Sequence, residues 1–172
     1  MADISAFKAN LATGGVRSNQ FRCVLTFPGV ANAGAAGNVA EFLCKATSVP
    51  SMDIGDIEIM YRGRPVHFAG ERTFSPWSIS LYNDNDFIVR TAFENWVEAI
   101  SNSGSTTGAV APNTYQAQMN VQQLDRNDVV VAEYQLIDAY PTSVGEIQLS
   151  WDANNQIQEY NVTFVYNYFN RI

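Results

Sequence analysis

The chain is poor in the residues that most enzymes and cofactor sites depend on. Charged residues make up 16% of its 172 residues, against a typical value of about 25%. Its single histidine, His67, lies between Val66 and Phe68, so a catalytic triad or a histidine-based metal site would rest on one side chain. The sequence contains no nucleophile-elbow, zinc-protease, CxxC or P-loop pattern. We therefore expect no catalytic, cofactor-binding or metal-binding site.

Positive charge and long apolar runs are also scarce. Ten Lys and Arg residues stand against 17 Asp and Glu, which gives a formal net charge of −7. Tight binding to a phosphate backbone needs clustered cations, so we expect none. No apolar run approaches the roughly 20 residues of a membrane span, and the first residues lack a signal-peptide pattern. We expect Cys23 and Cys44 to be reduced thiols, although the sequence leaves a disulfide between them open.

The most frequent pattern in the sequence is the alternation of apolar and polar residues, which predicts a mainly β, antiparallel protein. A hairpin is expected over 53–70, because Ile57, Ile59 and Tyr61 alternate with polar residues and Arg62-Gly63 supplies a turn. Trp77, Ile79 and Leu81 share one face of another strand. Further strands are expected over 20–27, 41–50, 115–122, 129–141, 146–151 and 156–169, with Pro141 ending the strand over 129–141.

One helix is expected over 83–101, where Val89, Phe93, Trp96 and Ile100 repeat at intervals of three and four. The Asn/Asp run before it would cap this helix. A short amphipathic helix is also plausible around residues 4–11. The Gly/Ala-rich stretch 29–40 and the polar stretch 101–114 are expected to be mobile loops of a single domain spanning 1–172.

Polar side chains line one face of two expected strands. Solvent exposure alone explains such a pattern, but a sheet face turned toward a water-filled lumen, in a barrel shared by several subunits, explains it too. The residues of these two polar faces are Gln116, Gln118, Asn120 and Gln122 on the first strand and Glu146 and Gln148 on the second.

Four stretches of the sequence resemble the tail tube proteins of T4-like contractile-tailed bacteriophages, in the same order and at similar spacing. The most specific parts are AGERTF and PTSVGEIQLSWDANN. The resemblance runs from about Asn19 to Tyr168, and the loops near 29–40 and 101–114 look longer than is usual in the family. The four stretches are LCKATSVP (43–50), AGERTFSPWSISLYND (69–84), AFENWVE (92–98) and YPTSVGEIQLSWDANNQIQEYNVTF (140–164).

The resemblance implies a small antiparallel β-barrel or sandwich with one α-helix, whose copies form hexameric rings. Each copy would give strands to the shared inner barrel, and the stacked rings would form a hollow tube inside the sheath, as a conduit for DNA ejection. Its implied partners are further copies of itself, the tail sheath protein, the baseplate tube initiator and the tail terminator. The tape measure protein and genomic DNA would occupy the lumen without tight binding. The protein would belong to the virion tail and be assembled in the host cytoplasm, with no membrane and no enzymatic activity.

The resemblance and the residue pattern together lead to hypotheses about three sets of residues: those that contact the next ring, those that line the lumen and those that anchor the packing. The hairpin would dock on the neighbouring ring through Asp53, Asp56, Glu58, Arg62 and Arg64. The lumen would be lined by Gln116, Gln118, Asn120, Gln122, Glu146 and Gln148. The packing anchors would be Trp77, Trp96 and Trp151.

Other functions remain open from the sequence. A baseplate tube initiator, or an inner-tube protein of a contractile injection or type VI secretion system, would share the fold. A different class is a monomeric β-sandwich that binds glycans on a platform of Tyr115, Tyr134 and Tyr140. A monomeric state in solution would favour this alternative.

Overall fold

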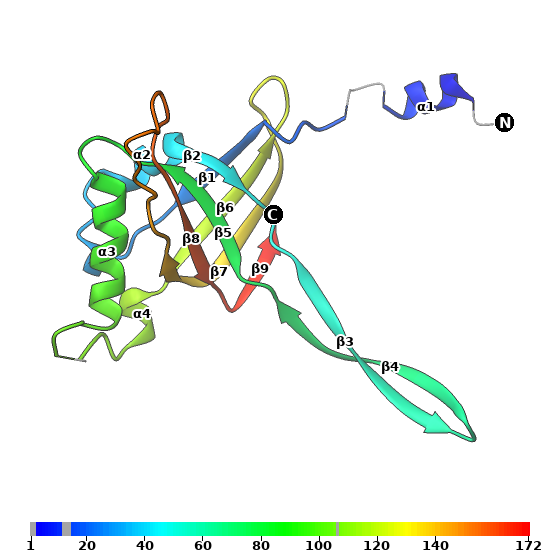
Figure 1. Cartoon of the computed structure of the whole chain (residues 1–172). Coiled ribbons are helices and arrows are strands. Elements are labelled where there is room, and N and C mark those ends of the chain that lie inside the picture. Colours follow the sequence, from blue (N-terminus) through cyan, green and yellow to red (C-terminus); the bar gives the residue numbers. More distant parts are fainter. Residues whose placement is uncertain (1–2, 12–14, 106) are drawn as a thin grey trace.

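The computed structural model describes residues 3–11, 15–105 and 107–172, and its main feature is one seven-stranded antiparallel sheet (Figure 1). The strands follow the order β1-β6-β7-β8-β5-β2, and β9 pairs with β7 beside this path. A separate two-stranded ribbon is formed by β3 and β4. The strands are β1 (Phe21–Leu25), β2 (Cys44–Thr47), β3 (Met52–Tyr61), β4 (Arg64–Phe74), β5 (Trp77–Tyr82), β6 (Ala117–Leu124), β7 (Val130–Val144), β8 (Glu159–Val165) and β9 (Tyr168–Arg171).

The antiparallel, mainly β class is confirmed, with two refinements. The terminal strands β1 and β2 are not paired with each other in the described chain, so the sheet is open and not a closed barrel. The expected single main helix is α3, and smaller helices accompany it within the described residues. The helices are α1 (Ile4–Asn10), η1 (Gly29–Ala31), α2 (Ala36–Leu43), α3 (Ile88–Ile100) and α4 (Pro112–Tyr115). None of the described helices combines the length and apolar character that crossing a membrane requires.

The core lies between the sheet and α3. Helix α3 buries Val89, Phe93 and Trp96, as its spacing predicts, and the Asp84 carboxylate accepts a hydrogen bond from the Ile88 N–H at 3.1 Å. Trp96 is fully buried and donates its indole N–H to the Tyr115 carbonyl at 2.7 Å. Burying an indole with its N–H paired stabilises a fold without a desolvation cost.

Trp77 is a second buried tryptophan. Its side chain is 1% exposed, and its indole N–H donates to the Ser48 carbonyl at 2.8 Å. The ring packs against Phe164 of β8, with 5.3 Å between ring centroids. This contact joins two neighbouring strands of the sheet, β5 and β8, on the face that alternation assigns to the core.

The stretch 29–40 contains helical residues, so the expectation of a loop without secondary structure there is wrong. Residues 29–31 form η1, and residues 36–43 form α2 where the sequence favoured a loop and then a strand beginning at 41. Ala31, Ala36 and Ala40 are completely buried. Small side chains let α2 approach β1 and η1 approach α3 closely, so the low complexity of this stretch reflects tight packing.

Two expectations about the last strands are also wrong. Strand β7 continues through Pro141 to Val144, because the proline lies beside a register shift between Pro141 and Ser143, where a missing N–H is tolerated. Residues 146–151 do not form a strand, and β8 begins only at Glu159. Both edges of β8 are already paired, with β7 and with β5, so this alternating stretch finds no free edge beside β8, the strand that follows it in the chain.

Two parts of the chain project from the body. The ribbon of β3 and β4 extends away at the lower right of Figure 1, and α1 lies apart at the upper right. Helix α1 begins after Asp3, whose carboxylate accepts from the Ser5 N–H at 2.9 Å, and it ends at Asn10. The ribbon is the expected hairpin, extended at both ends to residues 52–74.

Candidate assembly surfaces

The hairpin, residues 52–74, closes at Arg62 and Gly63 as its sequence predicts. Both residues have positive φ, 49° for Arg62 and 78° for Gly63. Two successive left-handed residues are typical of the type I′ turn, whose twist matches that of the flanking strands. Farther along the ribbon, a Cβ at Gly70 would lie 2.9 Å from the Gly55 carbonyl oxygen, so the strands approach closely at their bulge.

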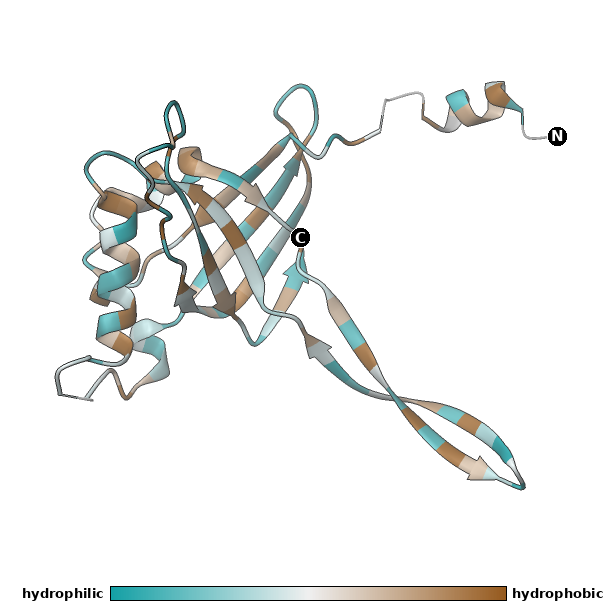
Figure 2. Ribbon diagram, in the orientation of Figure 1, coloured by the Kyte–Doolittle hydropathy of each residue, from teal (hydrophilic) through white to brown (hydrophobic). Residues whose placement is uncertain are grey.

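One face of the hairpin is apolar and uncovered. The register pairs Ile57 with Phe68 and Ile59 with Val66, which places these four side chains together. They are 39% to 53% exposed. Figure 2 shows the resulting alternation of hydrophobic and hydrophilic bands along the ribbon. A two-stranded ribbon is marginally stable alone, so an uncovered apolar face of this size indicates a surface that another molecule covers.

The five charged residues predicted to contact a neighbouring ring all lie on the hairpin and are exposed. Asp53, Asp56 and Glu58 are on β3, Arg62 lies in the turn, and Arg64 begins β4. Asp56 is paired with the only histidine, since its carboxylate lies 2.7 Å from the His67 Nδ1. The structure thus gives His67 a place in a solvent-exposed pair on the ribbon. Contact of these residues with another ring stays a prediction.

Strands β6 and β7 carry a polar face on the side of the sheet away from the core. Met119 and Val121 of β6 are buried, so Gln118, Asn120 and Gln122 point the other way. The Gln135 side chain donates to Gln118 at 3.2 Å, and the Asn120 amide donates to Glu133. We call these residues the polar sheet face: Gln118, Asn120, Gln122, Glu133 and Gln135.

The remaining residues predicted to line a lumen lie outside β6. Gln116 ends α4 just before the strand. Glu146 and Gln148 lie in the irregular segment 145–158, where their side chains hydrogen-bond each other. The alternation on β6 is confirmed, whereas the strand expected to carry Glu146 and Gln148 does not form. Which residues face a lumen stays a prediction for all six.

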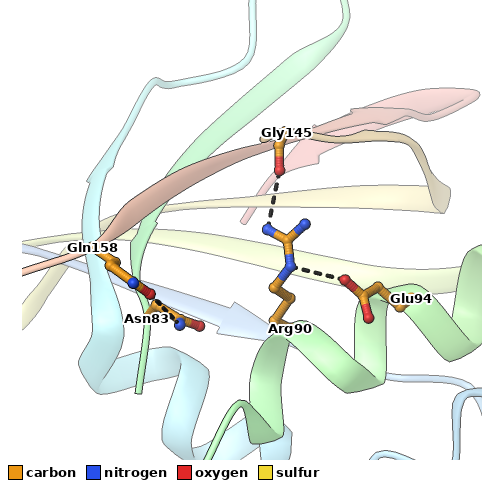
Figure 3. Close-up of polar contacts among 5 residues, drawn as sticks. All are labelled: Asn83, Arg90, Glu94, Gly145 and Gln158. Atoms are coloured by element: carbon orange, nitrogen blue, oxygen red, sulfur yellow. Dashed lines mark hydrogen bonds and ion pairs between the residues drawn. The ribbon is translucent and has the colours of Figure 1, made fainter. Parts of the chain in front are cut away.

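The irregular stretch 145–158, which we call the connecting segment, is fastened to the body at both ends (Figure 3). At its start, the Arg90 guanidinium donates to the Gly145 carbonyl at 3.0 Å and to Glu94 at 2.8 Å. At its end, the Asn83 side-chain amide donates to Gln158 at 3.0 Å. Helix α3 and the residues before it therefore hold the segment, although nothing in the sequence pattern connects Arg90 with Gly145.

Tyr160 packs against Arg90, the residue that holds the start of the connecting segment. Its ring is 5.2 Å from the Arg90 guanidinium carbon, a cation–π contact, and its buried hydroxyl has no hydrogen-bond partner among the described residues. Burial raises the pKa of Tyr160 well above its usual range, because the phenolate would lose its hydration. Arg90 opposes that rise in pKa, and Asp84 and Glu94 add to it.

Trp151 is not a packing anchor within the chain, and that prediction is wrong. Its side chain is fully exposed, at 101% of the reference value. Leu149 and Ile157, also on the connecting segment, are 77% and 69% exposed. The prediction assumed a strand whose tryptophan would pack on a neighbour, and this segment has none within the chain. The signal that could have identified an outward surface is the turn-forming sequence DANN that follows the tryptophan.

The tyrosines of the glycan-platform hypothesis are engaged within the chain. Tyr115 and Tyr140 pack edge to face, with ring centroids 5.6 Å apart. Tyr134 packs against Phe169 and lies under the Arg171 guanidinium. All three are partly buried, so they do not form an open aromatic platform.

The two cysteines are free thiols, as predicted. Cys23 is buried in β1 and Cys44 is half-buried at the start of β2. Hydrogen bonding with Cys44, followed by burial, raises the pKa of Cys23 well above its usual range. Cys23 is therefore a poor nucleophile at neutral pH. Within the described residues, no three His, Cys, Asp or Glu side chains cluster in a way that could hold a metal ion.

An open antiparallel sheet with a projecting, partly apolar ribbon is typical of a subunit that assembles with other molecules, and comparison with known proteins identifies the family. The family model for phage tail tube proteins matches residues 16–172. The chain is 33% identical over 134 residues to the tail tube protein gp19 of Enterobacteria phage T4, covering 77% of this chain and 82% of that protein. It is 25% identical over 168 residues to the tail tube protein of Serratia phage KSP90, covering 96% and 95% of the two chains.

Solved structures show the same fold. A chain in the six-fold symmetrised baseplate of the anti-feeding prophage has a TM-score of 0.68 at 13% identity, covering 92% of this chain and 95% of that chain. A chain in the extended sheath-tube complex of an extracellular contractile injection system has a TM-score of 0.58 at 11% identity, with 100% and 99% covered. The chain therefore belongs to the phage tail tube protein family. It is a tail tube protein of contractile phage tails and a structural part of the virion tail.

Proposed function

We propose that copies of this chain close six to a ring and that the rings stack through the hairpin into a hollow tube. The observation that carries the proposal is the hairpin itself, which projects from the body with an uncovered apolar face and two arginines at its tip. A surface of this kind on a protein of this family is best explained by contact with further copies. The role is mechanical, and it requires no catalytic group and no cofactor.

The polar sheet face is proposed as the wall of the lumen. Its members are amides with one carboxylate, Glu133. Two side-chain hydrogen bonds cross from β6 to β7 within this face, Gln118 with Gln135 and Asn120 with Glu133. The chain as a whole carries a net charge of −7. A wall that is neutral to acidic repels phosphates, so genomic DNA and a tape measure protein can pass without tight binding.

The remaining partners follow from the family and from the solved neighbours. Those neighbours come from a baseplate, from a sheath-tube complex and from assemblies named as a sheath/tube terminator and a tube-terminating cap. We propose that this tube starts on a baseplate initiator, is surrounded by the sheath protein and ends at a terminator. Assembly in the host cytoplasm is part of the same proposal.

Negative-stain electron microscopy of the purified protein, alone and on a baseplate seed, tests the proposal. We expect stacked hollow rings with six-fold symmetry. Arg62→Glu/Arg64→Glu should shorten the tubes and lower their yield, because the charges at the hairpin tip are reversed. Arg17→Glu/Arg126→Glu is the matched control, since both sites are exposed, lie off the hairpin and change the net charge equally.

Each contrary outcome has a separate meaning. Normal tube length and yield in the hairpin variant would contradict stacking through the arginines. Short stacks of fixed height, formed only on a baseplate, would favour the tube-initiator alternative. Protein that stays monomeric even with a seed would contradict the tube function as a whole.

A further inference from the structure

The connecting segment, residues 145–158, presents an apolar surface that the single chain leaves uncovered. Leu149, Trp151 and Ile157 are 77%, 101% and 69% exposed. A fully exposed tryptophan forgoes one of the largest burial contributions that any side chain can make. Three large apolar side chains on one 14-residue segment therefore mark an interaction surface.

The segment is held in place and is not a loose loop. The Gly145 N–H donates to the Asn161 carbonyl at 2.7 Å, and the Asn83 N–H donates to the Gln158 carbonyl at 2.9 Å. The Arg90 and Asn83 side chains fasten the same two ends. Fixing the ends before binding lowers the entropy lost on association. The surface is therefore suited to receive a partner.

A hollow lies beneath the segment. Its volume is about 560 Å³, and it is bounded by the segment on one side and by Ser80 and Asn161 of β5 and β8 on the other. Ser80 and Asn161 are opposite each other in the register and point away from the core. The hollow is large enough to take one or two side chains of a partner.

The charge and the position of the connecting segment indicate which surface would bind it. It carries the acids Glu146 and Asp152 and no Lys or Arg. The hairpin tip carries Arg62 and Arg64 next to the exposed side chains of Met60 and Tyr61. In Figure 1 the turn of the connecting segment is at the upper left of the body, and the hairpin tip is at the opposite end. Complementary surfaces at opposite ends of one molecule fit a head-to-tail contact that propagates from copy to copy.

We propose that the connecting segment of one copy is the receptor for the hairpin tip of the next copy in the stack. Arg62 and Arg64 lie against Glu146 and Asp152, and the tip covers Trp151, whose indole face accepts an arginine by a cation–π contact. Arg90 and Asn83 are positioning residues for this contact. The inference rests on the proposed stacking function and adds to it the surface on which the hairpin docks.

Tryptophan fluorescence tests the burial of Trp151 directly. Trp77 and Trp96 are 1% and 0% exposed, so quenching by acrylamide reports mainly on Trp151. The assignment is checked with Trp151→Phe, which should lose most of the quenching in the unassembled protein. We expect the quenching constant of the wild type to fall several-fold when tubes form from purified protein, without sheath.

A charge exchange tests the pairing. Glu146→Arg/Asp152→Arg alone should impair tube formation, as should Arg62→Glu/Arg64→Glu alone. The four changes combined restore the net charge of −7 and should restore tubes. As the control, Asp86→Arg/Glu98→Arg supplies the same charge at exposed sites off the segment and should not rescue the hairpin variant.

The failures of the two proposals are distinguishable. Tubes in which Trp151 stays as quenchable as in the monomer would overturn the inference and leave the tube function intact. That result would assign the surface to another partner such as the sheath. The pairing would also be overturned if the variant with all four changes formed no more tubes than Glu146→Arg/Asp152→Arg or Arg62→Glu/Arg64→Glu alone. Wild-type protein that forms no tube on a baseplate seed would remove the proposed function and this inference together.

Discussion

At the scale of single residues, the most informative side chains are Arg90 and Tyr160. Arg90 connects α3 to Gly145, 55 residues farther along the chain, and its side chain is only 18% exposed. Tyr160 packs against that guanidinium with a buried, unpaired hydroxyl. Arg90 therefore stabilises the attachment of the connecting segment to α3. Tyr160, in contact with Arg90, carries the desolvation cost of a buried hydroxyl that has no partner in the described part of the chain.

Replacing Arg90 should release the start of the connecting segment. Arg90→Ala removes a charge-assisted bond to Gly145 and should lower the free energy of unfolding by about 2 kcal/mol. Arg90→Lys should recover only part of this, because an ammonium cannot reproduce the guanidinium fork. Urea unfolding measures the stability, and limited proteolysis measures cleavage within 145–158. Arg126→Ala, at an exposed site, should change neither; an equal effect there would contradict the role assigned to Arg90.

Tyr160 should make the protein sensitive to alkaline pH. The folded-state pKa is raised above the ordinary value of 10.0, so the native state keeps a proton that the unfolded state loses. The contribution is therefore fully present below pH 10 and is lost above it, at most about 1.4 kcal/mol per pH unit. Tyr160→Phe should flatten the fall in urea midpoint between pH 9 and pH 11, and it should cost little at pH 8 because the hydroxyl has no partner. An unchanged slope in Tyr160→Phe, or an equal change in the exposed-site control Tyr168→Phe, would contradict this account.

At the scale of elements, the hairpin is the part of the fold that sequence predicts best. The alternation of Ile57, Ile59, Val66 and Phe68 determines which face each occupies, and the turn residues determine the register. The same period-two pattern assigns the core faces of β5 and β6, and the three-four spacing assigns α3. Local periodicity determines burial in β5, β6 and α3 because each of these three elements has a partner to pack against within the chain.

Gly63→Ala should destabilise the hairpin turn without unfolding the protein. Gly63 has φ of 78°, and an added Cβ there costs about 1 kcal/mol through backbone strain. Hydrogen exchange of the hairpin amides should accelerate several-fold, while exchange in β5 and β8 stays the same. Gly29→Ala is the control, because that position has open space and no positive φ. Faster exchange throughout the sheet in Gly63→Ala would show that the ribbon is not an independent unit.

At the scale of the whole molecule, the sheet separates two surfaces. Its core face is covered by α3 and α2 (Figure 1). The burial pattern and the register place the amides of β6 and β7 on the other face. The hairpin and the connecting segment lie at opposite ends of this body. In the proposed tube, the polar sheet face would line the lumen, and the hairpin and the connecting segment would form the stacking contacts.

Placing cations on the polar sheet face should make the tube retain DNA. Gln118→Lys/Gln122→Lys adds two positive charges per subunit on the proposed lumen side, and short duplex DNA should then co-sediment with tubes at low salt and be released as salt rises. Wild-type tubes should retain none. Thr91→Lys/Asn95→Lys adds the same charge on the exposed face of α3 and serves as the control. Salt-dependent retention that is equal in both variants would contradict the assignment of the lumen face.

The sequence by itself determined the antiparallel β class, the hairpin with its turn, the burial of Trp77 and Trp96, and the family, because periodicity and motifs are local properties. Only the tertiary structure decided the state of residues 29–40 and 145–158. The first became helices because Ala31, Ala36 and Ala40 fit closely against the core. The second stayed irregular, with Trp151 exposed, because both edges of β8 were already paired. A stretch that alternates like a strand becomes one only where a free strand edge lies next to it in the fold, and that depends on the rest of the chain.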